Sequence, residues 1–372
     1  MIFYRFGFVG IMQMEYISLK DVCKINMGQS PDSSSYNDNE DGIPFFQGNA
    51  DFGERYPVTR VWCNAPTKIA QPGDILISVR APIGALNFAK EECCIGRGLA
   101  SLTPDKSKVS LEFIYWLLKG KKAELNSKGT GSTFKAISRK VLEETMVPAV
   151  DFDKQHEYAE ILEKIYNVIQ KRKEELSALD NLIKARFVEL FGDPATNPKG
   201  WEETTIGDEC FYIKDGPHKS LPDIGKENGG HPFISVRNIV NGFIDFSTAR
   251  YISDEGYADA IKKCHPEKGD MLYSKGGTTG IAKLIDIDEE FANWVHVAVL
   301  KFDKSKLNGV FFENMLNGAY CYEQSQRLTK GIANRDLVLS AMAQIKMYRP
   351  PMELQEQFAD FVKQVDKSKV AA

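Results

Sequence analysis

Catalytic motifs are missing from this chain of 372 residues. The glycine-rich run at 276–280 lacks the lysine and the spacing of a P-loop, and no G-x-S-x-G, H-E-x-x-H or carboxylate–lysine nuclease pattern stands out. The five histidines are scattered and are expected to be structural or surface residues. We therefore predict a binding protein and not an enzyme, with no catalytic and no metal-ligating residues.

Cysteine patterning gives neither a zinc site nor a disulfide framework. The seven cysteines are an odd number, none forms a C-x-x-C pair, and Cys264-His265 has no second ligand pair at zinc spacing. We expect reduced thiols in a cytoplasmic protein.

Membrane-length apolar runs and an excess of basic charge are also missing. Residues 2–12 are apolar but include Arg5, are too short to cross a bilayer and precede no cleavage pattern. Residues 1–15 are read as a leader, within which Met14 is an alternative candidate for the native start. The formal net charge of −4 gives no overall signal for nucleic acid, although local patches decide binding more than totals do.

An internal repeat is the most informative feature that is present. Residues 73–80 (GDILISVR), closed by Gly84, return as 269–276 (GDMLYSKG), closed by Gly280. The matched positions are turn glycines and apolar strand residues, which define a fold, whereas the polar loops between them differ. The chain is therefore predicted to contain one duplicated domain. Further matches in the same order pair 19–23 with 206–210, 43–46 with 231–234, 113–114 with 311–312, and 158–160 with 358–360.

A long amphipathic helix is predicted between the copies. From Tyr158 to Leu190 apolar residues recur at alternating steps of four and three, which is an a/d seam that needs a partner helix. The helix spans roughly 37 residues, or about 55 Å. A second helix from Glu353 carries the same spacing at its apolar positions, Leu354, Phe358, Phe361 and Val365, and is expected to pack antiparallel on the first.

These patterns divide the chain into six segments. Short β-rich runs bounded by Gly, Pro and Asn, with a helix expected at 111–119, give each globular unit a mixed α+β content. The segments are a leader at 1–15, a first unit at 16–150, a long helix at 151–192, a linker at 193–200, a second unit at 201–351 and a shorter helix at 352–372.

Together, the repeat, the long helix and the junction at 193–201 resemble the specificity (S) subunit of type I restriction-modification systems. The motifs that carry the resemblance, which covers 16–372, are 19–22 (LKDV), 73–78 (GDILIS) with Gly84, 129–138 (GTGSTFKAIS) and 350–357 (PPMELQEQ). It implies an α+β fold, in which two similar mixed α/β target-recognition domains in a pseudo-two-fold arrangement are joined by long antiparallel coiled-coil helices. Members usually carry a full second helix ending much like 187–192, which is missing here.

The same resemblance implies a non-catalytic DNA-binding subunit that reads a bipartite target with one domain per half-site. The expected partners are double-stranded DNA, two methyltransferase (M) subunits docked on the helical rod, and restriction (R) subunits, with no membrane. No cofactor is expected in this chain, whereas S-adenosylmethionine, ATP and Mg are expected on the partner subunits.

Polar residues in glycine-bracketed loops are the candidate DNA contacts, because Arg and Lys read guanine, and Asn and Gln read adenine, in the major groove. Asp74 and Asp270, which each follow a glycine, are expected to form turns instead. The candidates are Gln47, Asn49, Arg80, Ser132 and Lys135 in the first unit, and Arg237, Asn238, Lys275, Thr278, Thr279, Asn334 and Arg335 in the second.

Two other interpretations stay open. A coiled-coil scaffold whose globular ends bind proteins agrees with the negative net charge. A remnant of a fused methyltransferase–nuclease would need a cofactor loop and an Asn-Pro-Pro-aromatic motif, and the sequence shows neither.

Overall fold

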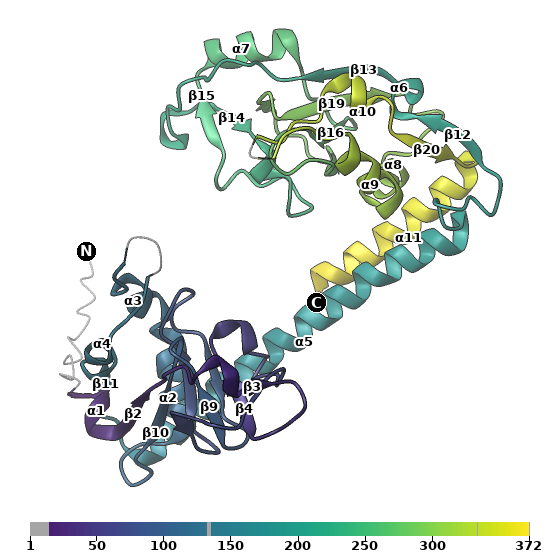
Figure 1. The fold of residues 1–372 in the computed structure, drawn as a ribbon. Coiled ribbons are helices and arrows are strands. Elements are labelled where there is room, and N and C mark those ends of the chain that lie inside the picture. The colour runs from purple at the N-terminus through teal and green to yellow at the C-terminus, as the bar shows by residue number, and fades with distance from the viewer. Residues whose placement is uncertain (1–14, 132–134, 333, 372) are drawn as a thin grey trace, which may run out of the picture. The chain divides into compact units, whose positions relative to one another are not determined.

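The computed structural model describes residues 15–131, 135–332 and 334–371 (Figure 1). The chain divides into a first unit that extends to Gln170 and a second unit that starts at Lys171. The boundary lies within the long helix α5 (Phe152–Phe191). Among the described residues, no helix is long and apolar enough to cross a membrane.

The first unit is built on two β-sheets, which explains its alternation of short apolar runs and turn residues. A four-stranded antiparallel sheet has the order β2 (Cys23–Met27), β10 (Leu99–Pro104), β7 (Ile75–Ser78), β8 (Leu86–Phe88). A sheet of five short strands has the order β3 (Tyr36–Asn37), β5 (Trp62–Cys63), β4 (Ile43–Phe46), β9 (Cys93–Ile95), β6 (Ile69–Ala70). A two-stranded sheet joins β1 (Tyr16–Ser18) to β11 (Met146–Pro148).

Short helices cover the four-stranded sheet of the first unit. The helix expected at 111–119 is present as α2 (Leu111–Gly120), and it begins there because the Ser110 hydroxyl accepts the Phe113 N–H at 3.1 Å. The buried face of α2 packs on the apolar residues of β7 and β10. The other helices are α1 (Leu19–Val22), α3 (Lys122–Ser127) and α4 (Arg139–Glu143), with 3-10 turns η1 (Ser33–Ser35) and η2 (Asn49–Asp51).

The second unit repeats this plan. Its four-stranded sheet has the order β13 (Cys210–Asp215), β19 (Val297–Phe302), β16 (Met271–Ser274), β17 (Ala282–Leu284). The smaller sheets are β15 (Arg250–Ile252), β14 (His231–Ile234), β18 (Ala292–Asn293), and β12 (Glu202–Thr205) with β20 (Lys346–Arg349). Its helices are α6 (Ile206–Glu209), α7 (Asp254–Lys263), α8 (Gly309–Asn317), α9 (Ala319–Leu328), α10 (Leu339–Met342) and α11 (Met352–Ala371), with η3 (Lys226–Asn228) and η4 (Val236–Asn238).

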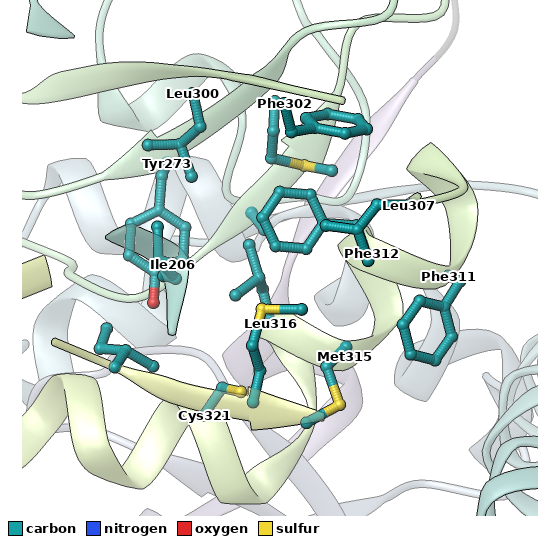
Figure 2. Close-up of a cluster of buried hydrophobic side chains, with 14 of the residues drawn as sticks. Ile206, Tyr273, Leu300, Phe302, Leu307, Phe311, Phe312, Met315, Leu316 and Cys321 are labelled. Atoms are coloured by element: carbon teal, nitrogen blue, oxygen red, sulfur yellow. The ribbon is translucent and has the colours of Figure 1, made fainter. Parts of the chain in front are cut away.

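The core of the second unit lies between its four-stranded sheet and α8. Figure 2 shows Phe312 and Leu316 of α8 beside Tyr273 and Leu300 of the sheet, and all four side chains are fully buried. Burying each such side chain contributes about 1.5–3 kcal/mol relative to leaving it exposed, so this layer supplies much of the unit's stability.

Matching hydrogen bonds show that the repeat is a duplication of structure. The buried Gln155 side chain accepts the Ser110 N–H at 2.8 Å and donates to the Val150 carbonyl at 2.8 Å. The buried Gln355 side chain accepts the Asn308 N–H at 2.9 Å and donates to the Pro350 carbonyl at 2.8 Å. In both units the strand order of the four-stranded sheet is also the same.

The partner helix expected for the long helix is present as α11, within the second unit. Phe358 of α11 contacts the rings of Phe187 and Phe191 of α5, at centroid distances of 5.4 and 5.7 Å. Lys369, near the other end of α11, pairs with Asp180 at 2.9 Å, so the two helices run antiparallel (Figure 1). Among the described residues, α11 covers the predicted seam along this last part of α5, since α11 has 20 residues and α5 has 40.

Candidate nucleic-acid interface

Three turns at one edge of the first unit form a polar groove. Strands β4 and β9 pair in parallel, so their carboxyl ends meet, and the Gly96 N–H bonds the Phe46 carbonyl at 2.8 Å. The turn after β7 joins them through the bond from the Val79 N–H to the Gly98 carbonyl at 2.9 Å. The groove, of about 450 Å³, is lined by Gln47, Gly48, Asn49, Ala50, Asp51, Arg80, Ala81, Pro82, Arg97 and Gly98.

The walls of this groove are held by bonds to backbone N–H groups and by a close backbone approach. The Asp51 carboxylate accepts the N–H groups of Gln47 at 2.7 Å and Gly48 at 3.2 Å, which fixes the turn at η2. Gly98 must stay a glycine, because a Cβ there would lie 2.3 Å from the Gln47 carbonyl oxygen. Gln47 itself is exposed.

Two arginines give the groove its chemistry. Arg80 and Arg97 are both exposed and line it from different turns. A guanidinium is a planar fork of donors that matches the guanine O6/N7 edge or a phosphate, while Asn49 and Gln47 offer the amide that matches adenine. Arg97 was not among the residues predicted from the sequence, although its bracketing by Gly96 and Gly98 meets the criterion that selected the others.

Of the remaining first-unit candidates, one is described. Lys135 is exposed, and its carbonyl accepts the Ala81 N–H at 3.0 Å, so its backbone lies beside the turn that carries Arg80. Ser132 lies outside the described residues.

The equivalent turn of the second unit is built with Asn238, which is buried. Its Oδ1 accepts the Ser235 N–H at 2.8 Å and its Nδ2 donates to the Asp245 carbonyl at 2.8 Å. Asn238 therefore does for η4 what Asp51 does for η2, and its amide is not presented to a ligand. The neighbouring Arg237 is exposed and donates to the Thr248 carbonyl.

Arg237 also acts on a nearby carboxylate. The pKa of Asp223 lies below its usual range, first because the backbone N–H groups of Tyr251 and Gly225 donate to it, and further because Arg250 and Arg237 are close. The carboxylate of Asp223 is therefore a negative charge close to the exposed Arg237.

Lys275 is the buried cation of an ion cluster. Its Nζ lies 2.9 Å from Asp336 Oδ1 and 3.6 Å from Asp215 Oδ2, and Asp215 also pairs with Lys263 at 2.6 Å. With 6% of its surface exposed, Lys275 is held within the protein, because a buried lysine is stable only when its charge is paired.

Thr279 is likewise buried, whereas the other candidates of the second unit reach the surface. The Thr279 hydroxyl lies 2.9 Å from that of Thr329, and the half-buried Arg335 donates to Gln326. Thr278 and Asn334 are exposed. In the structure, Asn238, Lys275 and Thr279 thus shape the loops that carry Arg237, Thr278, Asn334 and Arg335.

One further turn has the same frame in both units. Thr130 and Ala136 exchange two backbone bonds of 2.9 Å, and Lys330 and Asp336 do the same. The last residue of each loop is cationic, Lys135 in the first unit and Arg335 in the second. The Arg335 carbonyl accepts the Gly277 N–H at 3.0 Å, which places Arg335 beside the neighbouring turn. Both units therefore offer positive charge at an equivalent place.

The two aspartates expected in turns are there. Asp74 Oδ2 accepts the Gln71 N–H at 3.0 Å, and Asp270 Oδ2 accepts the Glu267 N–H at 2.9 Å. Both residues are buried, and their carboxylates are bonded within the turns. Among the described side chains, no group of His, Cys, Asp and Glu is arranged to hold a metal ion.

Two segments of the chain match the same protein-family model. The model of the type I restriction modification DNA specificity domain matches residues 12–178 and again 198–371. The chain is 45% identical over 152 residues to a putative type I restriction enzyme MjaX specificity subunit of Methanocaldococcus jannaschii, covering 41% of this chain and 36% of that protein. It is 27% identical over 273 residues to the MjaIX specificity subunit of the same organism, covering 69% and 62%. The matches thus span less than two thirds of either relative.

A solved structure shares the fold over nearly the whole chain. The S subunit of a type I restriction-modification system from M. genitalium superposes with a TM-score of 0.59, covering 97% of this chain and 91% of that one. The identity is 15%, so this likeness concerns the fold alone.

Proposed function

From the premise that this chain belongs to the type I restriction modification DNA specificity family, we propose that it is the sequence-reading subunit of a type I restriction-modification complex. Each unit would bind one half of a bipartite duplex target. The observation that carries the proposal is that two units with the same hydrogen-bonded turns present different polar side chains on them. Equivalent frames with different readers are what two different half-sites require.

The first unit supplies the clearest reading surface. Arg80 and Arg97 would bind guanine edges or phosphates, and Asn49 or Gln47 would pair with adenine. The second unit has Gly276 and Val295 at the places of the two arginines, and offers Arg237, Thr278 and Asn334 instead. We therefore expect the two half-sites to differ in sequence.

The chemistry of the complex would belong to partner subunits in the cytoplasm. We expect two methyltransferase subunits to dock on α5 and α11 and to bring S-adenosylmethionine, and restriction subunits to bring the ATP- and Mg-dependent cleavage. Support comes from the names of the relatives, which are specificity subunits of restriction enzymes. The comparisons support neither the protein scaffold nor the fused methyltransferase–nuclease remnant.

The test is binding of duplex DNA by the full chain, alone and with methyltransferase subunits added. Fluorescence anisotropy over a range of salt should give log K falling linearly with log salt, because each phosphate contact releases counterions. Binding that is absent under both conditions, or that does not depend on salt, would overturn the proposal.

A further inference from the structure

Backbone hydrogen bonds show which residues of the two units occupy equivalent places around the reading turns. In the first unit the Val79 N–H bonds the Gly98 carbonyl at 2.9 Å. In the second unit the Lys275 N–H bonds the His296 carbonyl at 2.8 Å. His296 therefore lies where the first unit has Gly98.

The residues that follow Val79 and Lys275 form a second equivalent pair. Arg80 pairs with Ala136 in an isolated antiparallel bridge, and Gly276 pairs with Asp336 in the same way. Gly276 therefore lies where the first unit has Arg80. At these two neighbouring places each unit has one glycine and one polar side chain, but in opposite order.

Both glycines are required by what lies next to them. A Cβ at Gly98 would lie 2.3 Å from the Gln47 carbonyl oxygen, so this place in the first unit holds no side chain. A Cβ at Gly276 would lie 2.1 Å from His296 Nδ1, so the imidazole occupies the space that a side chain at 276 would need. The first unit thus carries Arg80 on one turn, and the second carries His296 on the facing turn.

The His296 ring is exposed and held in one position. The Trp294 ring contacts it edge to face, with centroids 5.3 Å apart and an interplanar angle of 68°. The His296 atoms nearest to a Cβ at Gly276 would be Nδ1, Cγ and Cβ, so Nε2 lies on the farther side of the ring. An imidazole nitrogen that carries its proton donates one hydrogen bond, so Nε2 is placed to donate to a ligand.

We propose that His296 is a specificity-determining residue of the second unit and the counterpart of Arg80 in the first. Its Nε2–H donates to the O6 or N7 acceptor of a guanine in the major groove. One N–H replaces the fork of a guanidinium, so His296 discriminates less strongly than Arg80 does. The inference rests on the proposed function, because it requires that the two units bind two half-sites.

The test uses a duplex that the full chain binds specifically, with methyltransferase subunits added if binding requires them. Each base pair of both half-sites is replaced in turn, and affinity is measured by fluorescence anisotropy at one salt concentration. The wild type should prefer guanine by at least tenfold, about 1.4 kcal/mol, at one pair that His296→Ala no longer distinguishes. Arg80→Ala should lose a preference in the other half-site and leave this one unchanged.

The matched control is His265→Ala. His265 is half-buried and precedes β16, whereas the turn at Gly276 follows that strand, so the two lie at opposite ends of it. This variant should keep every base preference of the wild type.

A reciprocal exchange tests the same place without relying on loss alone. His296→Gly removes the atoms that a Cβ at position 276 would meet, so Gly276→Arg can be combined with it. The double variant rebuilds the arrangement of the first unit. It should regain at least a tenfold preference for guanine at the base pair that His296→Gly alone no longer distinguishes.

Three results would contradict the inference while leaving the proposed function intact. They are unchanged base preferences in His296→Ala, a change in the same half-site that Arg80→Ala affects, and a uniform loss of affinity with all preferences kept, which indicates a phosphate contact. A wild type that distinguishes no base pair would instead remove the proposed function, and the inference with it.

Discussion

The turn after β4 in the first unit and the turn after β14 in the second are the same structure made with different residues. Asp51 holds the first by accepting the N–H groups of Gln47 and Gly48, and Asn238 holds the second by accepting the N–H of Ser235. The side chains beyond these anchors differ, with Arg97 facing the groove in the first unit and Val295 at the equivalent place in the second. Polar side chains that bond the backbone thus fix the frame of the turn, whereas the exposed side chains beyond them are free to change what it binds.

The helices extend the same contrast to apolar residues. Phe358 is fully buried against α5 and α8, whereas Tyr158, its equivalent, is nearly half exposed. The same position therefore contributes to the core of one unit and to the surface of the other.

The largest effect is expected when Phe358 and its equivalent Tyr158 are each replaced by alanine. Phe358→Ala should lower the free energy of unfolding of the second unit by about 3–5 kcal/mol, because it removes a fully buried ring. Tyr158→Ala should cost less than about 1 kcal/mol, since much of its ring is already in water. Denaturant unfolding followed by circular dichroism measures both. Equal losses would contradict the difference in burial.

The next effect tests whether the two frames are equivalent. Gln155→Ala and Gln355→Ala should each destabilise their own unit by about 2–3 kcal/mol, because both leave buried backbone groups without partners. The same unfolding experiment applies. A loss confined to one variant would show that only one of the two glutamines holds its unit together.

A smaller effect on DNA binding is expected from Arg97 of the first turn, and none from Asn238 of the second. On a duplex that the wild type binds specifically, Arg97→Ala should weaken binding by about 1–3 kcal/mol if the arginine reads guanine. If it contacts a phosphate instead, the slope of log K against log salt should fall by about one. Asn238→Ala should lower the stability of the second unit and leave that slope unchanged, because its amide is bound within the turn. An unchanged affinity for Arg97→Ala would remove this residue from the site.

The smallest effect concerns two equivalent thiols. Burial raises the pKa of Cys23 and of Cys210 from 9.0 to about 12. A thiol with a raised pKa contributes stability below pH 9, and this contribution is lost as the pH rises from 9 toward 12, because the unfolded chain releases the proton first. At pH 10 each thiol accounts for about 1.4 kcal/mol of the loss.

The measurement compares unfolding at pH 8 and pH 10. Cys23→Ala and Cys210→Ala should each reduce the loss of unfolding free energy between the two pH values by about 1.4 kcal/mol. A variant that loses as much stability as the wild type between the two pH values would show that its thiol is not protected.

Much of this architecture was predictable from local patterns. The repeated glycine–aspartate turns predicted the duplicated domain. The spacing of apolar residues by four and three positions predicted α5 and α11. Both patterns depend on residues close together in the chain. The turn roles of Asp74 and Asp270 are confirmed for the same reason.

Which of the candidate site residues are buried could not be predicted from the sequence. Lys275 reads as an exposed loop cation, but its partners Asp215 and Asp336 lie about sixty residues away in either direction. Asn238 was likewise predicted to be a reader because its type suits adenine, yet the turn uses its amide. The incomplete covering of α5 by α11 agrees with the shorter second helix that the sequence predicts.

The most direct test of two separate half-site readers is selection of bound duplexes from a randomised library. The wild-type chain, with methyltransferase subunits added if binding requires them, should enrich two specified segments separated by a fixed number of unspecified base pairs. A chain with Arg80→Ala and Arg97→Ala should lose the specification of one segment, and Arg237→Ala should weaken only the other. One continuous segment, or the same segment eroded by both sets of changes, would contradict the account.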